Sequence, residues 1–272
     1  MLYLIATPIG NLGDITYRAV ETLQSCDEVW CEDTRQSAKL LNHLDIKKPL
    51  TSCHDYTQQE KAPQLVEKLR AGLSIAYVSD AGMPGISDPG AVLVRACIEA
   101  GLPYTVLPGP SAVLTAAVLS GLPLDRFTFF GFLPREGSER KKALDDLCAC
   151  GCTAILYESP HRVKDTLQDV LAAVGDCPCA LARELTKVHE SCYRGLISEV
   201  LAALPDEIRG ECVLLFSVPP KADQAPTEQE LDALLLQLMA HMTLKDAARE
   251  AAEALKLPKK QVYARALEMK ER

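Results

Sequence analysis

Short apolar runs alternate with amphipathic segments along the first 218 residues. The apolar runs have the length and composition of buried strands, which we expect at residues 3–7, 27–31, 73–78, 104–107, 127–130, 153–157, 178–183 and 211–217. Segments with helical spacing of apolar positions fill most intervals, at about 16–25, 34–44, 57–70, 90–100, 111–120, 138–149, 161–174 and 196–203. This alternation predicts an α/β architecture with a largely parallel sheet.

A Gly/Pro-rich loop, VSDAGMPGISDPG, follows the third of these strands at residues 78–90. Glycine lets backbone N–H groups approach a ligand closely, and proline restricts the backbone. Asp88 or Ser87 is available to cap the following helix, with Pro89 suited to its first position. The loop is therefore expected at the carboxyl end of a strand, where open parallel sheets bind ligands. Taken alone, such a loop is more often a tight turn that needs positive φ.

Pro108-Gly109-Pro110 follows a strand and precedes a helix, so we expect a hinge there. It would separate an N-terminal α/β domain, residues 1–109, from a second α/β domain, residues 110–218. The N-terminal domain carries the 78–90 loop.

The proline-rich polar segment 219–226 predicts a linker, and residues 227–272 have a helical pattern throughout. Thr243 is placed to cap one helix, and a short turn at 256–258 leads to another, as in a helix-turn-helix module. Residues 240–272 hold eight Lys/Arg and five Asp/Glu, whereas the whole chain has a net charge of −8. This asymmetry favours a tail that faces nucleic acid, although an ordinary α-hairpin explains it as well.

The composition narrows the function classes. A net charge of −8 argues against a generic nucleic-acid binder but permits a local basic patch. The eleven cysteines include no C-x-x-C pair, which predicts reduced thiols and no metal site, with metal binding at the C-x-C patterns as the alternative. The chain has no apolar stretch of membrane length, and its N-terminus lacks the basic region of a signal peptide. We therefore expect a cytoplasmic protein without a membrane partner.

Several predicted strands end in small and polar residues. These segments are 7–14, 31–35, 78–90, 108–112, 157–162 and 183–187. Because the carboxyl ends of parallel strands gather at one edge of a sheet, the segments predict a common cleft. Neither G-x-G-x-x-G after the first strand nor a P-loop is present, so a zwitterionic or nucleoside ligand without a pyrophosphate is favoured.

In this order, the same segments resemble those of the bacterial ribosomal RNA small subunit methyltransferase I family, in the tetrapyrrole-methylase-like superfamily. The resemblance covers residues 1–218, and the helical tail also fits. It implies the two-domain fold of class III S-adenosylmethionine methyltransferases with a helix-turn-helix-like tail, in a homodimer. It further implies 2′-O-methylation of a cytidine ribose in the decoding region of 16S ribosomal RNA, in the small ribosomal subunit.

The resemblance also implies contacts to S-adenosyl-L-methionine in a cleft between the domains. The residues are Pro8, Gly10, Asp80, Gly82, Met83, Pro84, Ile86, Ser111, Ala112, Tyr157 and Leu185. Tetrapyrrole enzymes of the superfamily carry G-D-P where this chain has Gly82-Met83-Pro84, which favours the RNA branch. Two alternatives stay open: tetrapyrrole C-methylation, and a cofactor-sensing DNA-binding regulator that uses the tail.

A positioned general base would assist methylation of a ribose hydroxyl. Candidates at strand ends are Asp33, Asp88, Glu158 and His161, with Asp80 and Glu184 also considered. Each has a structural alternative: Asp88 caps a helix, Asp33 pairs with Arg35, and His161 begins a helix. The sequence does not choose among them.

A loop with basic residues enters a helix at residues 131–142 and predicts an RNA contact. Basic side chains would hold phosphates while Phe132 stacks on an extruded base. The RNA-binding candidates are Arg35, Phe132, Arg135, Arg140, Lys141, Lys142 and Arg162. A solvated helix start is the structural alternative.

Overall fold

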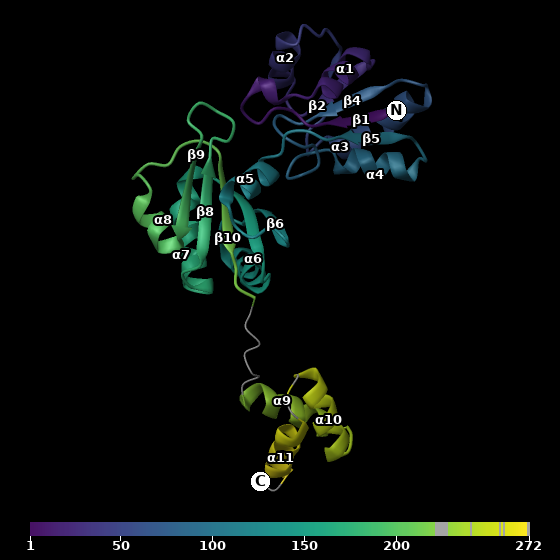
Figure 1. Ribbon diagram of the computed structural model, residues 1–272. Coiled ribbons are helices and arrows are strands. Elements are labelled where there is room, and N and C mark those ends of the chain that lie inside the picture. The colour runs from purple at the N-terminus through teal and green to yellow at the C-terminus, as the bar shows by residue number, and fades with distance from the viewer. Residues whose placement is uncertain (221–227, 240, 256, 258, 271–272) are drawn as a thin grey trace. The chain divides into compact units, whose positions relative to one another are not determined.

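The computed structural model describes residues 1–220, 228–239, 241–255, 257 and 259–270. The chain divides into two compact units, residues 1–218 and 219–272 (Figure 1). Most of the predicted linker 219–226 lies outside the described residues, as do positions 256 and 258 of the predicted turn. None of the described helices is long and apolar enough to cross a membrane.

The first half of the larger unit is a five-stranded parallel sheet in the order β3-β2-β4-β1-β5. Its elements are β1 (Leu2–Ile5), η1 (Leu12–Asp14), α1 (Tyr17–Ser25), β2 (Glu28–Cys31), α2 (Thr34–His43), β3 (Leu50–Ser52), α3 (Gln58–Arg70), β4 (Ile75–Val78), α4 (Ala91–Glu99) and β5 (Tyr104–Leu107). In β1, Leu2 and Leu4 pack with α3 and α4, while Ile5 packs with α1 and α2 on the opposite face. The alternation of a strand thus builds two apolar layers.

The second half has a mixed sheet in the order β6-β7-β10-β8-β9. Its elements are α5 (Ala112–Ser120), β6 (Phe127–Phe132), α6 (Gly137–Ala149), β7 (Thr153–Glu158), η2 (Pro160–Arg162), α7 (Val163–Val174), β8 (Pro178–Arg183), β9 (Ser191–Leu196), α8 (Ile197–Ala203) and β10 (Cys212–Ser217). Only β6 and β7 pair in parallel, whereas β10 runs antiparallel to both of its neighbours. The prediction of a largely parallel sheet is therefore wrong for this half.

Two strands were missed by the sequence prediction. β3 has only three residues, all partly exposed, and β9 begins with Ser191 and includes Arg194 and Gly195. Neither has the apolar run that predicts a buried strand, and pairing with a neighbouring strand holds each in place. The prediction of an α/β fold itself is confirmed.

The start of α4 differs from the prediction. The helix begins at Ala91 behind Gly90, whose φ is 133°, so neither Ser87 nor Asp88 is its N-cap. The reason is a turn in which the Gly85 N–H donates to the Pro89 carbonyl at 3.0 Å and keeps those residues outside the helix.

The smaller unit contains α9 (Glu228–Met239), α10 (Leu244–Ala254) and α11 (Lys259–Lys270), packed around one apolar cluster. Thr243 caps α10 as predicted, because its Oγ1 accepts from the Asp246 N–H at 3.3 Å.

The two halves of the larger unit meet through their loops. Ile9 follows β1 in sequence yet packs in the apolar cluster beneath α5, with Leu185. Gly10 lies so close to the loop after β8 that a Cβ on it would be 2.5 Å from Lys187 Cγ. The loop after β1 therefore lies directly against the loop after β8.

Candidate functional site

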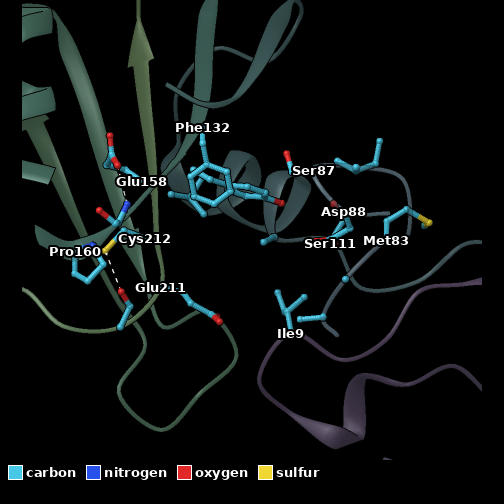
Figure 2. Close-up of a pocket in the computed structure, with 18 residues that line it drawn as sticks. Ile9, Met83, Ser87, Asp88, Ser111, Phe132, Glu158, Pro160, Glu211 and Cys212 are labelled. Carbon is cyan, nitrogen blue, oxygen red and sulfur yellow. Dashed lines mark hydrogen bonds between the residues drawn. The ribbon is translucent and has the colours of Figure 1, made fainter. Parts of the chain in front are cut away.

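A cavity of about 310 Å³ lies where the two sheets face each other, lined by residues of both halves (Figure 2). Ile9, Met83, Ser87 and Asp88 come from the first half. The second half contributes Ser111 and Ala112 at the start of α5, residues 157–160 after β7, Phe132, and residues 210–213 at the start of β10. The volume is that of a pocket for a small molecule or cofactor.

The 78–90 loop is anchored to the loop after β1. Thr7 and Gly82 exchange two backbone hydrogen bonds, each of 2.9 Å. Ser79 Oγ donates to the Gly82 carbonyl at 3.2 Å, and Thr7 Oγ1 donates to the Ser79 carbonyl at 3.1 Å. Gly82 and Gly85 have φ of 80° and 83°. The loop therefore needs its glycines for the turn, and it also lines the cavity.

One carboxylate, that of Asp88, belongs to the first-half wall, and those of Glu32, Asp55 and Asp80 lie close to it outside the lining. Burial, with Glu32, Asp80 and Asp55 nearby, raises the pKa of Asp88 to about 6. Burial also raises the pKa of Glu32 and of Asp80. Asp80 does not line the cavity, and its Oδ1 accepts from the Asp33 N–H at 3.1 Å. A cation in the cavity would offset the repulsion among these groups.

Asp33 lies outside the cavity lining and is the N-cap of α2. Its carboxylate accepts from the Arg35 N–H at 2.8 Å and from the guanidinium of that residue at 2.7 Å. These bonds lower the pKa of Asp33 to about 2. The structural alternative, a local ion pair with Arg35, is what the structure shows for this residue.

The second-half wall is aromatic. Tyr157 packs edge-on against Phe129, with ring centroids 5.0 Å apart, and its ring lies 5.4 Å from that of Phe132. Burial raises the pKa of Tyr157 to about 12, so its hydroxyl stays protonated at neutral pH. Phe132 is 59% exposed at the cavity mouth. It offers a flat apolar surface to a ligand.

Two of the four predicted bases, Asp88 and Glu158, line the cavity, whereas Asp33 and His161 do not. The Glu158 side chain is only 1% exposed. Its Oε1 accepts from the Ser159 N–H at 2.8 Å and its Oε2 from Thr166 Oγ1 at 2.7 Å. Both carboxylate oxygens are therefore engaged within the protein. Glu184, the further candidate, is paired with Lys187 at 2.8 Å outside the lining.

Six of the eleven predicted cofactor residues line the cavity: Gly82, Met83, Ile86, Ser111, Ala112 and Tyr157. The other five, Pro8, Gly10, Asp80, Pro84 and Leu185, are next to lining residues or pack behind them.

The predicted RNA-binding residues fall into three groups. Phe132 lines the cavity, and Arg35, Arg135, Lys141 and Lys142 are exposed outside it. Arg140 and Arg162 are largely buried and donate to backbone carbonyls of residues 133 and 134.

Sequence reasoning missed Ile9, Ala81, Ser87, Ser159, Pro160 and residues 210–213 as lining residues. Five of these positions belong to segments already singled out. Residues 210–213 were missed because the ends of strands were searched, whereas the antiparallel β10 brings its beginning to this edge. The Gly210-Glu211 pair directly before the strand was the available signal.

Comparisons with known proteins show which family the chain resembles over nearly its whole length. Residues 1–201 match the family model described as Tetrapyrrole (Corrin/Porphyrin) Methylases, and residues 225–270 match the RsmI C-terminal HTH domain. The ribosomal RNA small subunit methyltransferase I of Synechocystis sp. is 44% identical over 99% of this chain and 98% of its own length. The protein of the same name from Haemophilus influenzae is 45% identical over 97% of this chain and 95% of its own.

Solved structures share the fold. Diphthine synthase superposes with a TM-score of 0.61 at 13% identity, covering 79% of this chain and 89% of its own. Uroporphyrin III C-methyltransferase from Thermus thermophilus gives 0.57 at 19% identity, covering 80% and 97%. The expected class III methyltransferase fold with a helix-turn-helix-like C-terminal unit is thus confirmed. The chain belongs to the tetrapyrrole methylases and, within them, to the ribosomal RNA small subunit methyltransferase I family.

Proposed function

We propose that the protein transfers a methyl group from S-adenosylmethionine to the ribose 2′-oxygen of a cytidine in the decoding region of 16S ribosomal RNA. The observation that carries the proposal is a cavity whose first-half wall holds Gly82 and the carboxylate of Asp88 and whose second-half wall holds the rings of Phe132 and Tyr157. Relatives named ribosomal RNA small subunit methyltransferase I, similar over nearly the whole length, support the substrate class.

The residues present suit this cofactor. S-adenosylmethionine carries a positive sulfonium and a positive ammonium group, which the carboxylate of Asp88 complements. Gly82 lines the cavity without a side chain and so leaves room for a ligand there, and Ser111, the N-cap of α5, lines it from the second half. The bound group would supply an electrophilic methyl. The protein's part is to hold the reacting atoms in line, which provides much of the acceleration in such displacements.

The RNA that accepts the methyl group would bind at the aromatic wall, which we call the acceptor side of the cavity. Phe132, exposed at the cavity mouth, would stack on the target base or a neighbour, and the exposed Arg135, Lys141 and Lys142 would hold phosphates. Of the predicted bases in the lining, Glu158 has both oxygens engaged. Asp88, with a pKa raised to about 6, is the candidate that remains for accepting the hydroxyl proton.

Methyl transfer from labelled S-adenosylmethionine to small ribosomal subunits that lack their own modification tests the proposal directly. We expect label on one ribose 2′-oxygen in the decoding region after nuclease mapping, and none on subunits that already carry the modification. Label on a base, or on a tetrapyrrole offered in parallel, would overturn the assignment of the acceptor. We expect assembled subunits to be methylated faster than naked RNA, because an acidic protein with local basic patches needs several contacts.

We also propose a homodimer in the cytoplasm, where ribosomal subunits are made. Apolar side chains that α5 exposes, Leu114 at 56% and Val118 at 76%, lie one turn apart on the same helix face and support a subunit contact. Light scattering should give twice the chain mass for the wild type and a lower mass for Val118→Glu. A monomeric wild type at micromolar concentration would contradict this.

A further inference from the structure

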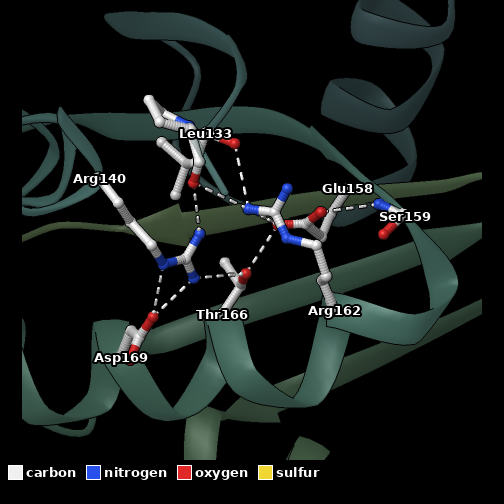
Figure 3. A network of polar contacts seen from close by, with 8 residues as sticks. Leu133, Arg140, Glu158, Ser159, Arg162, Thr166 and Asp169 are labelled. Atoms are coloured by element: carbon white, nitrogen blue, oxygen red, sulfur yellow. Dashed lines mark hydrogen bonds and ion pairs between the residues drawn. The ribbon is translucent and has the colours of Figure 1, made fainter. Parts of the chain in front are cut away.

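Two guanidinium groups hold the chain just after the end of β6 (Figure 3). Arg162 Nη2 donates to the carbonyls of Leu133 at 3.0 Å and Pro134 at 3.1 Å. Arg140 Nη1 donates to the same Pro134 carbonyl at 3.1 Å. We call this arrangement the carbonyl clamp. Two like charges therefore converge on one short stretch of backbone.

Three side-chain acceptors hold the two cations of the carbonyl clamp in place: Glu158 and Thr166 are buried, and Asp169 is 42% exposed. Glu158 Oε2 lies 3.5 Å from Arg162 Nη2 and accepts from Thr166 Oγ1 at 2.7 Å. Arg140 donates from Nη2 to the same Thr166 oxygen at 3.1 Å, and its Nε and Nη2 donate to Asp169 at 3.0 and 2.6 Å. Arg140 and Arg162 side chains are only 12% and 24% exposed. The two guanidinium groups therefore bind partners within the protein rather than facing solvent.

The clamped segment carries the acceptor side of the cavity. Phe132 comes directly before Leu133, and Arg135 directly after Pro134. β6 is an edge strand of the described sheet, and its pairing with β7 shifts register between Phe129 and Phe132. The end of β6 is paired on one side only and follows a register shift, so the carbonyl clamp adds a second restraint just beyond it.

We infer that Arg162 and Arg140 are positioning residues that fix Phe132 and the basic loop for the acceptor nucleotide, and that they do not themselves bind RNA phosphates. The inference rests on the proposed function and refines it. Glu158 acts together with the two arginines, because its buried carboxylate lies beside Arg162 and orients the guanidinium. Phosphate binding, which we expect from sequence of these arginines as well, then stays with the exposed candidates, among them Arg135, Lys141 and Lys142.

The test compares Arg162→Met and Arg162→Lys with the wild type in methyl transfer to small subunits. For Arg162→Met we expect kcat/KM for subunits to fall about 10- to 100-fold, the range produced by a misplaced binding group. The Kd for S-adenosylmethionine, measured by calorimetry, should stay within about twofold. Arg162→Lys keeps a donor and should recover part of the loss. Lys68→Met, which removes a half-buried ion pair with Glu28 in the other sheet, is the matched control and should leave kcat/KM unchanged.

Salt dependence separates positioning from phosphate contact. A residue that neutralises a phosphate lowers the slope of log affinity against log salt by about one when it is removed. We expect the slope for subunit binding to be unchanged in Arg162→Met and reduced in Lys142→Met. A reduced slope in Arg162→Met would overturn the inference, as would wild-type kinetics in that variant.

Coupling to Phe132 provides a second criterion. If the carbonyl clamp acts through this segment, Phe132→Ala combined with Arg162→Met should lose little more than the worse single variant. Independent, multiplicative losses would contradict the inference. Should Arg162→Met fail to fold because Glu158 is left unpaired, Glu158→Gln with Arg162→Met removes both charges and takes its place. Absence of methyl transfer by the wild type would instead contradict the proposed function itself.

Discussion

Thr7 and Gly82 exchange two backbone hydrogen bonds of 2.9 Å and so join the loop after β1 to the loop after β4. Gly82 can make this pair because its φ is 80°, a value that side chains disfavour. The bridge holds the glycine-rich wall of the cavity, which follows β4, against the end of the neighbouring strand β1. A change at Gly82 therefore bears on stability and on the cavity together.

We expect Gly82→Ala to destabilise the fold by about 1 kcal/mol through its positive φ. It should also weaken S-adenosylmethionine binding, because the added Cβ approaches the lining residue Ile9 at 3.4 Å. Gly72→Ala is the matched control, with φ 91° and nothing within 4 Å of the added Cβ. Thermal melting and calorimetry should show similar losses of stability, with weaker binding only in Gly82→Ala. Equal binding by both variants would contradict the prediction.

Binding of the cofactor should depend on pH through Asp88. Its pKa is raised to about 6, chiefly by burial, and a cationic ligand favours the ionised carboxylate. Binding then releases a proton near that pH, so affinity rises with pH through about 6 and levels off above it. Calorimetry in buffers of different ionisation enthalpy measures this release. Asp88→Asn should bind S-adenosylmethionine more weakly at neutral pH, and its affinity should not rise with pH through about 6.

The raised pKa of Asp88 also predicts how the stability of the free protein changes with pH. Because the folded-state pKa of Asp88 is above its ordinary value, ionisation disfavours the free folded protein as pH rises through about 6. Asp88→Asn should therefore melt higher than the wild type at pH 7 when no ligand is present. Its advantage should shrink below pH 5. A lower melting temperature at neutral pH would indicate a role for the carboxylate in the fold.

The start of β10 depends on Gly210. Its φ is 84°, and an added Cβ would lie 2.3 Å from Glu184 Oε1. That oxygen accepts from Lys187 Nζ at 2.8 Å and from the Glu211 N–H at 2.9 Å. Gly210→Ala should thus displace Glu184, melt earlier and bind cofactor more weakly. Gly175→Ala, with φ 89° and open space around the added Cβ, should affect stability alone.

Removal of residues 219–272 should leave cofactor binding intact. Every residue that lines the cavity falls within residues 1–218, which form a compact unit of their own. We expect an unchanged Kd for S-adenosylmethionine and a higher KM for small subunits. Loss of cofactor binding would contradict the prediction, and an unchanged KM would show that the tail does not contribute to the acceptor.

Strand ends rich in small and polar residues predict lining residues on both walls of the site. β1, β4 and β7 end at the cavity edge as expected, and Gly82, Ser111 and Tyr157 line it. The start of β10 was missed because strand direction depends on pairing between distant segments, which a local pattern does not encode. The role of Arg162 could not be predicted either. An arginine that binds backbone carbonyls of its own chain cannot be told from one that binds phosphate by its sequence alone.

The close contact at Gly10 links the two walls of the cavity. A Cβ at this position would lie 2.5 Å from Lys187 Cγ and 2.8 Å from the Leu185 carbonyl oxygen, so the loop after β1 has no room for a side chain there. A larger residue at position 10 would therefore push apart the loops after β1 and β8, and with them the two walls that a ligand has to contact at the same time.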